Sequence, residues 1–103
     1  MRFLVIDDSA TMRKIVGLAL TGAGHTYSEA ENGQMGLELA KGSTFDCIML
    51  DVNMPVMNGL EFLGQRAADA AIRKIPVVVL TTQSEESLKA EAKRLGAEAF
   101  LEK

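Results

Sequence analysis

The stretch CIMLDVNMPVMNG, residues 47–59, carries an apolar run that ends abruptly on a carboxylate. The run from Cys47 to Leu50 is too short for a buried helix and indicates a strand that is covered on both faces. Asp51 follows directly, and Pro55 and Gly59 then shape a loop rather than a continued strand. The pattern therefore predicts a buried strand that delivers a carboxylate to the rim of a sheet.

Other segments alternate with this one in a regular way. Strands are predicted within FLVIDD (3–8), TYSEA (26–30), FDCIMLD (45–51), IPVVVLTT (75–82) and AEAFLEK (97–103). Helices are predicted over 10–22, over 33–41, from Gly59 onward, and from an N-cap at Ser84 to a stop at Gly96. Five strands that alternate with four helices predict one α/β domain over residues 1–103, with a parallel sheet and helices on both of its faces.

Helical spacing also predicts which side of two helices faces the core. In the first helix the apolar positions fall at i, i+3, i+4 and i+7, namely Met12, Ile15, Val16 and Ala19. In the last helix the inner positions are Leu88, Ala92 and Leu95.

Composition excludes several classes of protein. The 103 residues carry a formal net charge of −3, which disfavours a broad nucleic-acid-binding surface. The single cysteine, Cys47, lies in an apolar run, so a buried, inert thiol is expected rather than a disulfide. No apolar stretch approaches the roughly 20 residues that cross a bilayer, and the early acids Asp7 and Asp8 do not suit a signal peptide. We expect a cytoplasmic protein, with His25 exposed in the turn before the second strand.

The predicted strands end in polar groups that should meet at one edge. Ligands of open parallel sheets bind outside the carboxyl ends of the strands. The groups at these ends are Asp7 and Asp8, Asp51, Thr81 and Thr82, and Lys103. Two carboxylates about 4 Å apart repel by about 4 kcal/mol at an effective dielectric near 20, so three need a cation. An incomplete set of oxygen ligands suits Mg²⁺, and the absence of a nearby His or Cys argues against zinc.

Such an edge could support phosphoryl chemistry. Asp51, on the central strand, is the natural nucleophile for an aspartyl phosphate, with Asp7 and Asp8 holding the metal. Thr81 and Lys103 would then neutralise the transferred group. Plainer interpretations stay open for each residue alone: Asp8 as a helix cap, Thr81 as an ordinary strand end, and Lys103 as a solvated terminus.

The motifs VIDDS (5–9), IMLDVNMPVMNGLEFL (48–63), VVVLTT (77–82) and LGAEAFLEK (95–103) resemble the receiver domains of two-component response regulators. The segment ATMRKIV (10–16) and the D-x-N-M-P loop are most similar to the stand-alone chemotaxis regulators of that family. The resemblance implies a flavodoxin-like doubly wound sheet in the order 2-1-3-4-5. It also implies a phosphorylation-activated signalling switch, with a histidine kinase and a downstream effector as partners.

The resemblance further implies a role for each site residue. Asp51 would accept the phosphoryl group, while Asp8, Asp51 and the backbone carbonyl of Asn53 would coordinate Mg²⁺ and Asp7 would act through water. Thr81 and Lys103 would bind the phosphoryl oxygens. Thr81 would also couple to the aromatic residue of the fifth strand, Phe100, whose other interpretation is a plain core residue. Such a domain assists its own phosphorylation and dephosphorylation without being a free-standing enzyme.

Two departures from the family pattern leave alternatives open. The family normally continues with a final helix beside the first, and without it an apolar patch is left on the sheet. Either the chain is truncated after the fifth strand, or a homodimer or swapped partner covers the patch. Thr82 is bulkier than the family's usual residue. The alternative functions are a Mg²⁺-dependent phosphohydrolase, which would need an acid/base where Asn53 stands, and a receiver-shaped scaffold that never takes phosphate.

Overall fold

The computed structural model describes residues 1–51, 59–70, 72–81 and 86–102, apart from the side chains at 59–60, 81, 86–89 and 100–102. In chain order the elements are β1 (Arg2–Ile6), α1 (Ala10–Gly22), β2 (Thr26–Ala30), α2 (Gly33–Gly42), β3 (Cys47–Asp51), α3 (Gly59–Ala67), β4 (Val77–Thr81), α4 (Glu86–Arg94) and β5 (Ala99–Glu102). This alternation confirms the α/β fold class predicted from the apolar runs. Ser84, the predicted N-cap of α4, lies outside the described residues, and Gly96 follows that helix with a φ of +106°.

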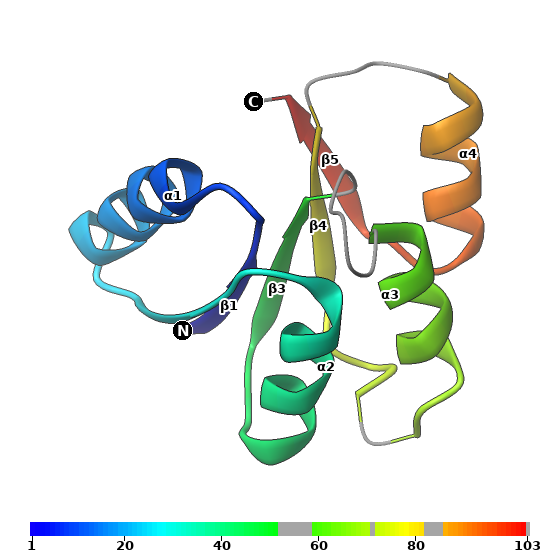
Figure 1. Ribbon diagram of the computed structural model, residues 1–103, viewed down its shortest axis with the longest axis horizontal. Helices are drawn as coiled ribbons and strands as arrows, with labels where there is room; N and C mark the ends of the chain where they lie inside the picture. Colours follow the sequence, from blue (N-terminus) through cyan, green and yellow to red (C-terminus); the bar gives the residue numbers. More distant parts are fainter. Residues whose placement is uncertain (52–58, 71, 82–85, 103) are drawn as a thin grey trace.

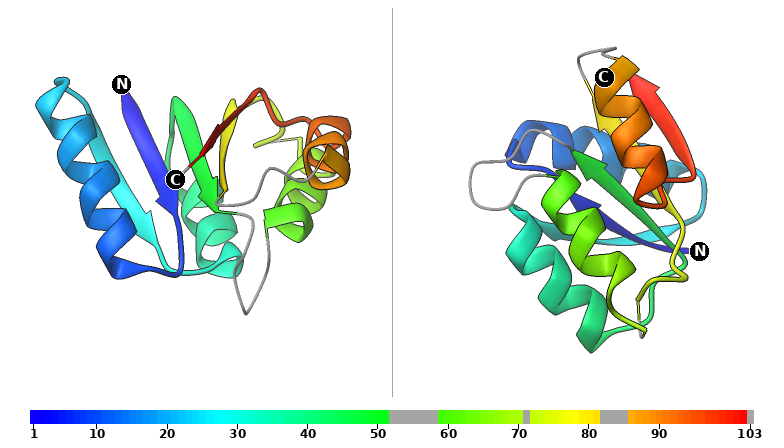
Figure 2. Two further views of the ribbon diagram at one scale, coloured as in Figure 1. Left: turned by 90° about the horizontal axis from the view of Figure 1, so that it is seen from above. Right: turned by 90° about the vertical axis from the view of Figure 1, so that its right-hand side faces the viewer.

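The five strands form one parallel sheet in the order β2-β1-β3-β4-β5, as the family resemblance implied. Helix α1 covers one face of the sheet, and α2, α3 and α4 lie on the other (Figures 1 and 2). Because all five strands run the same way, their carboxyl ends share one edge. β3 is the central strand, so Asp51 at its end has neighbouring strands on both sides.

The main core lies between the sheet and the α2–α3 layer. Alternate residues of the three central strands point into it and are fully or almost fully buried: Leu4, Ile6, Ile48, Leu50, Val77 and Val79. Phe62 and Leu63 of α3 pack against them with no exposed surface. Burying a side chain of this size contributes about 1.5–3 kcal/mol, so this layer anchors the strands whose ends carry the acids.

Two glycines allow helices to approach the sheet closely. A Cβ atom built on Gly36 of α2 would lie 2.4 Å from Cδ1 of Ile6 in β1. A Cβ atom on Gly17 of α1 would lie 2.2 Å from Cζ of Tyr27 in β2. A larger residue at either place would require the helix or its neighbour to move.

The inner face predicted for α1 is partly wrong. Gly17 is buried and Met12, Arg13 and Val16 are half-buried, whereas Ala19 is exposed and Ile15 is 54% exposed. The face is set by the Gly17–Tyr27 contact, so the helix is turned away from the orientation that apolar spacing alone suggests. In α4 the prediction holds for Ala92, which is buried, and for Leu95, which packs against the core; the side chain of Leu88 lies outside the described part.

Other single-residue predictions can be compared with the structure. Cys47 is buried, as expected, and burial raises the pKa of its thiol. His25 does lie in the turn before β2, but it is half-buried rather than exposed, because its ring packs against Phe3 with centroids 5.1 Å apart. Within the described residues, no helix is both long and apolar enough to span a membrane.

Candidate functional site

The end of β1 turns sharply so that two consecutive acids reach the edge of the sheet. The backbone N–H of Asp7 donates to the carbonyl of Ala30 at 3.1 Å, which extends the β1–β2 pairing by one residue. The N–H of Ser9 then donates to Oδ1 of Asp7 at 2.9 Å, and Oγ of Ser9 accepts from the N–H of Met12 at 3.2 Å. Ser9, and not Asp8, is therefore the N-cap of α1, which leaves the Asp8 carboxylate available to the site.

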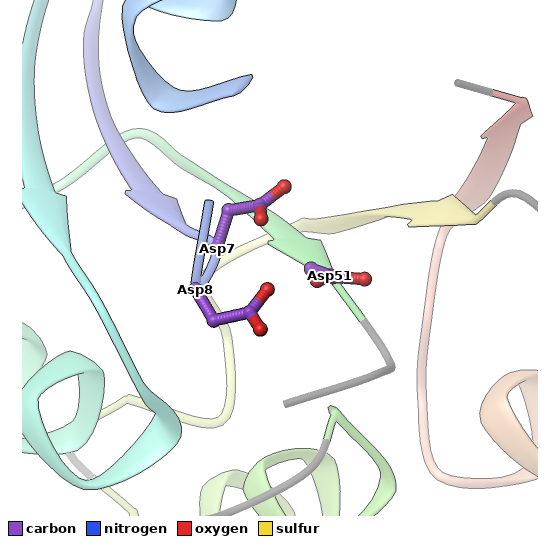
Figure 3. A group of neighbouring side chains, drawn as sticks. All are labelled: Asp7, Asp8 and Asp51. Atoms are coloured by element: carbon purple, nitrogen blue, oxygen red, sulfur yellow. The ribbon is translucent and has the colours of Figure 1, made fainter. Parts of the chain in front are cut away.

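Asp51 arrives at the same edge from the neighbouring strand. In the parallel β1–β3 ladder Ile6 pairs with Leu50, so the residues that follow each of them, Asp7 and Asp51, stand at the same level. Asp7 is fully buried and Asp51 is only 3% exposed, whereas Asp8 is exposed. Figure 3 shows the carboxylates of Asp7 and Asp8 extending from the end of β1 toward the end of β3, where Asp51 lies. The predicted convergence of these three acids is confirmed.

The three carboxylates are close enough to require compensation. One oxygen from each lies within 4.8 Å of the others. At that separation two ionised carboxylates repel by about 3 kcal/mol at an effective dielectric near 20, and the cluster contains three such pairs. Two of the three groups are also almost completely removed from water, which adds a desolvation cost. An arrangement of this kind is stabilised by a bound cation.

The donor set fits a small hard cation. Mg²⁺ holds oxygen ligands at about 2.1 Å, so two ligands of one ion lie up to about 4.2 Å apart. The three carboxylate oxygens all lie within 4.8 Å of one another, which is the same scale. The exposed Asp8 leaves an open side, which suits an ion that keeps several waters. Nitrogen and sulfur donors, which zinc prefers, are not part of the cluster found among the described residues.

The remaining predicted site residues are placed only in part. Thr81 is the last residue of β4 and pairs with Glu102 of β5, while Asp51 pairs with Leu80. The backbone of Thr81 therefore lies one residue beyond the level of Asp51 on the adjacent strand. Phe100 pairs with Val79. The side chains of Thr81 and Phe100, and all of Asn53, Thr82 and Lys103, lie outside the described part of the chain.

Arg13 and its partner Glu29 lie near the site and were not predicted from the sequence. Arg13 donates from Nη1 to the backbone carbonyl of Asp7 at 2.6 Å and from Nε to Glu29 at 3.1 Å. Its position between Met12 and Val16 on the half-buried side of α1 is the signal that could have identified it, because a charged residue there needs a partner.

Comparisons with known proteins agree with this architecture. A model of the response regulator receiver domain matches residues 3–103. Protein PilH of Pseudomonas aeruginosa is 37% identical over 102 residues, which cover 99% of this chain and 84% of PilH.

Solved structures show the same similarity in three dimensions. The structure of chemotaxis protein CheY4 of Vibrio cholerae superposes with a TM-score of 0.93 at 36% identity, covering 99% of this chain and 85% of that one. The phosphorylated cyanobacterial phytochrome response regulator RcpA superposes with a TM-score of 0.89 at 25% identity, covering 99% of this chain and 79% of that one. Sequence and structure together show that this chain belongs to the response regulator receiver domain family.

Proposed function

We propose that this domain is a phosphorylation-activated signalling switch in which Asp51 accepts a phosphoryl group from a histidine kinase. The observation that carries the proposal is the position of Asp51 at the end of the central strand, with its carboxylate within 4.8 Å of those of Asp7 and Asp8. Membership of the receiver family supports the same chemistry, and one member with this fold, RcpA, is described as phosphorylated.

The chemistry follows from the surroundings of Asp51. An oxygen of its carboxylate would attack phosphorus, and the bond from phosphorus to the donor's imidazole nitrogen would break, leaving its electron pair on that nitrogen, which takes up a proton. With only 3% of its surface exposed, Asp51 presents its carboxylate to a donor through a narrow opening. This restriction holds the donor in line with the attacking oxygen.

We assign Asp7, Asp8 and Asp51 as the side chains that hold Mg²⁺, with the backbone carbonyl of Asn53 as a further ligand. When bound, the ion neutralises charge on the phosphoryl oxygens. The protein's own contribution is to fix the Asp7 carboxylate through the N–H of Ser9 and to leave Asp8 exposed.

Thr81 and Lys103 are proposed to bind the phosphoryl oxygens from the other side. The support is the strand order, which sets β4 beside β3, and the register, which pairs Thr81 with the residue before Lys103. Phe100, two residues before Glu102 on the same strand, is proposed to report the state of Thr81 to the surface of β5.

The partners proposed are a histidine kinase as donor and an effector protein as target, in the cytoplasm. The relatives named as chemotaxis proteins, CheY4 and CheY-3 of Vibrio cholerae, suggest a chemotaxis pathway. The domain's role is regulatory: it would catalyse its own phosphorylation and dephosphorylation but turn over no separate substrate.

The test is phosphorylation by a small donor, measured by intact mass. Incubation with acetyl phosphate and Mg²⁺ should add about 80 Da, the mass of one phosphoryl group, and chelation of the metal should suppress the adduct. Asp51→Asn should abolish it. Asp46→Asn is the matched control, because Asp46 is an exposed acid just before the opposite end of β3. An adduct that persists in Asp51→Asn, or that is lost equally in Asp46→Asn, would refute the assignment.

A further inference from the structure

Arg13 joins the end of β1 to the edge strand of the sheet. It extends from the first turn of α1, and its Nη1 donates to the backbone carbonyl of Asp7 at 2.6 Å. Its Nε donates to Oε1 of Glu29 in β2 at 3.1 Å. The side chain is 15% exposed, so the guanidinium is held in a largely enclosed position between the two strands.

The Asp7 carbonyl is a sensitive place for such a contact. Its peptide group connects Asp7 to Asp8 and is planar, so the direction of the carbonyl fixes the direction in which the chain enters Asp8. The carbonyl lies beyond the last ladder pair of β1, Ile6 with Ala30, and follows the Asp7 N–H, which still bonds to β2. A rotation of this peptide would move the Asp8 carboxylate relative to Asp51.

We propose that Arg13 is a positioning residue for the metal site, which sets the Asp7–Asp8 peptide in the orientation that brings both carboxylates toward Asp51. Glu29 holds the guanidinium in place and offsets its charge. This inference rests on the proposed function, because it assumes that the three acids bind Mg²⁺.

The charge of Arg13 and its positioning role have opposite effects on Mg²⁺ affinity, so a substitution of Arg13 distinguishes them. Arg13 is a cation near a cation site, so on charge alone its removal should strengthen Mg²⁺ binding. If Arg13 positions the carboxylates, its removal should weaken binding. Loss of a group that orients metal ligands typically lowers affinity by about 10- to 100-fold.

The experiment measures Mg²⁺ affinity by amide chemical-shift titration, which also reports whether each variant is folded. Arg13→Met removes the charge and the hydrogen bonds, whereas Arg13→Lys keeps the charge but lacks the planar fork that bonds two acceptors at once. Both should weaken Mg²⁺ binding by about tenfold or more. The matched control is Lys14→Met, because Lys14 is an exposed cation on the same turn and no ion pair or hydrogen bond joins it to the described residues.

The outcomes separate this inference from the function on which it rests. Weaker binding in both Arg13 variants, with Lys14→Met close to the wild type, supports positioning. Unchanged or tighter binding in Arg13→Met overturns it, as does a lower melting temperature with an unchanged Mg²⁺ affinity. Should Arg13→Met fail to fold, Arg13→Lys alone decides. A wild-type protein that does not bind Mg²⁺ at all would overturn the proposed metal site itself.

Discussion

Gly36 is the position where the packing between α2 and the sheet can be tested most sharply. The substitution Gly36→Ala adds one methyl group to the interior of α2 (Gly33–Gly42). That methyl would lie 2.4 Å from Cδ1 of Ile6, 3.0 Å from its Cγ1 and 3.4 Å from Cε2 of Phe62. Ile6 directly precedes Asp7, so the same contact supports the strand that carries the acid pair.

The expected free-energy change is a balance of two effects. Alanine is favoured over glycine in a helix interior by up to about 1 kcal/mol. Overpacking a well-packed core costs about 1–3 kcal/mol, and we expect the upper part of this range because Ile6 and Phe62 are both fully buried. We therefore expect Gly36→Ala to lower the free energy of unfolding by about 1–2 kcal/mol. Each kcal/mol corresponds to a decrease of roughly 4–8 °C in melting temperature for a domain of this size.

Urea denaturation gives the comparison, with Gly42→Ala as the matched control in the same helix. A Cβ atom on Gly42 would meet nothing within 4 Å, so this variant should be unchanged or slightly more stable. A double-mutant cycle then isolates the clash, because Ile6→Val removes Cδ1, the nearest atom. In the Ile6→Val background, Gly36→Ala should cost at least about 1 kcal/mol less than in the wild type.

Two results would refute this reasoning. If Gly36→Ala were as stable as Gly42→Ala, α2 would not approach β1 as closely as the structure shows. If the clash persisted undiminished after Ile6→Val, its partner would be some other atom.

Two further predictions concern buried polar groups. Arg66 is 4% exposed and donates from Nε and Nη2 to the carbonyl of Ile75 at 3.0 and 2.7 Å. Arg66→Met should destabilise the domain by about 1–3 kcal/mol in urea unfolding, because this half-buried carbonyl loses both donors. Equal or greater stability of this variant would mean that the two bonds contribute nothing net. Burial raises the pKa of the Cys47 thiol and shields it, so an aromatic disulfide reagent at neutral pH should modify Cys47 more slowly in the native protein than in denaturant. Equal rates would contradict its burial.

The strands could be predicted from the sequence because a parallel sheet buries both of its faces. A strand such as β4 (Val77–Thr81) then appears as an unbroken apolar run, which needs no knowledge of its neighbours. The first helix was also bounded correctly at Ala10–Gly22, since Ser9 is a strong N-cap and Gly24 follows the helix with a positive φ. The order of the strands came from the family resemblance rather than from this local pattern.

The orientation of α1 could not be predicted in the same way. Apolar spacing favoured Ile15 and Ala19 as inner positions. The inner position of a helix can also be fixed by the small size of a residue rather than by its hydrophobicity. Gly17 faces inward because only a glycine admits the Tyr27 ring, and Arg13 is tolerated on the half-buried side because it is paired. Both contacts join residues that are 10 or more positions apart, so the pattern within the helix does not contain them.

The acidic site was predictable for the opposite reason. Asp7, Asp8 and Asp51 follow directly after strands, and parallel strands bring their carboxyl ends to one edge whatever the detail of packing. Half-buried Arg13 and buried Arg66 were missed because arginine is usually exposed and because both donate to backbone carbonyls. Every residue has a backbone carbonyl, so such a partner cannot be recognised from the residue types in the sequence.

The most direct test of the account is to locate the phosphoryl group itself in the wild-type chain. An aspartyl phosphate is an acyl phosphate, which borohydride reduces to the alcohol, so the phosphorylated residue becomes homoserine and can be found by tandem mass spectrometry of peptides. After treatment with acetyl phosphate and Mg²⁺ and then borohydride, we expect homoserine at position 51 alone. Homoserine at position 7 or 8 instead, or at no aspartate in a protein that has gained phosphate, would contradict it.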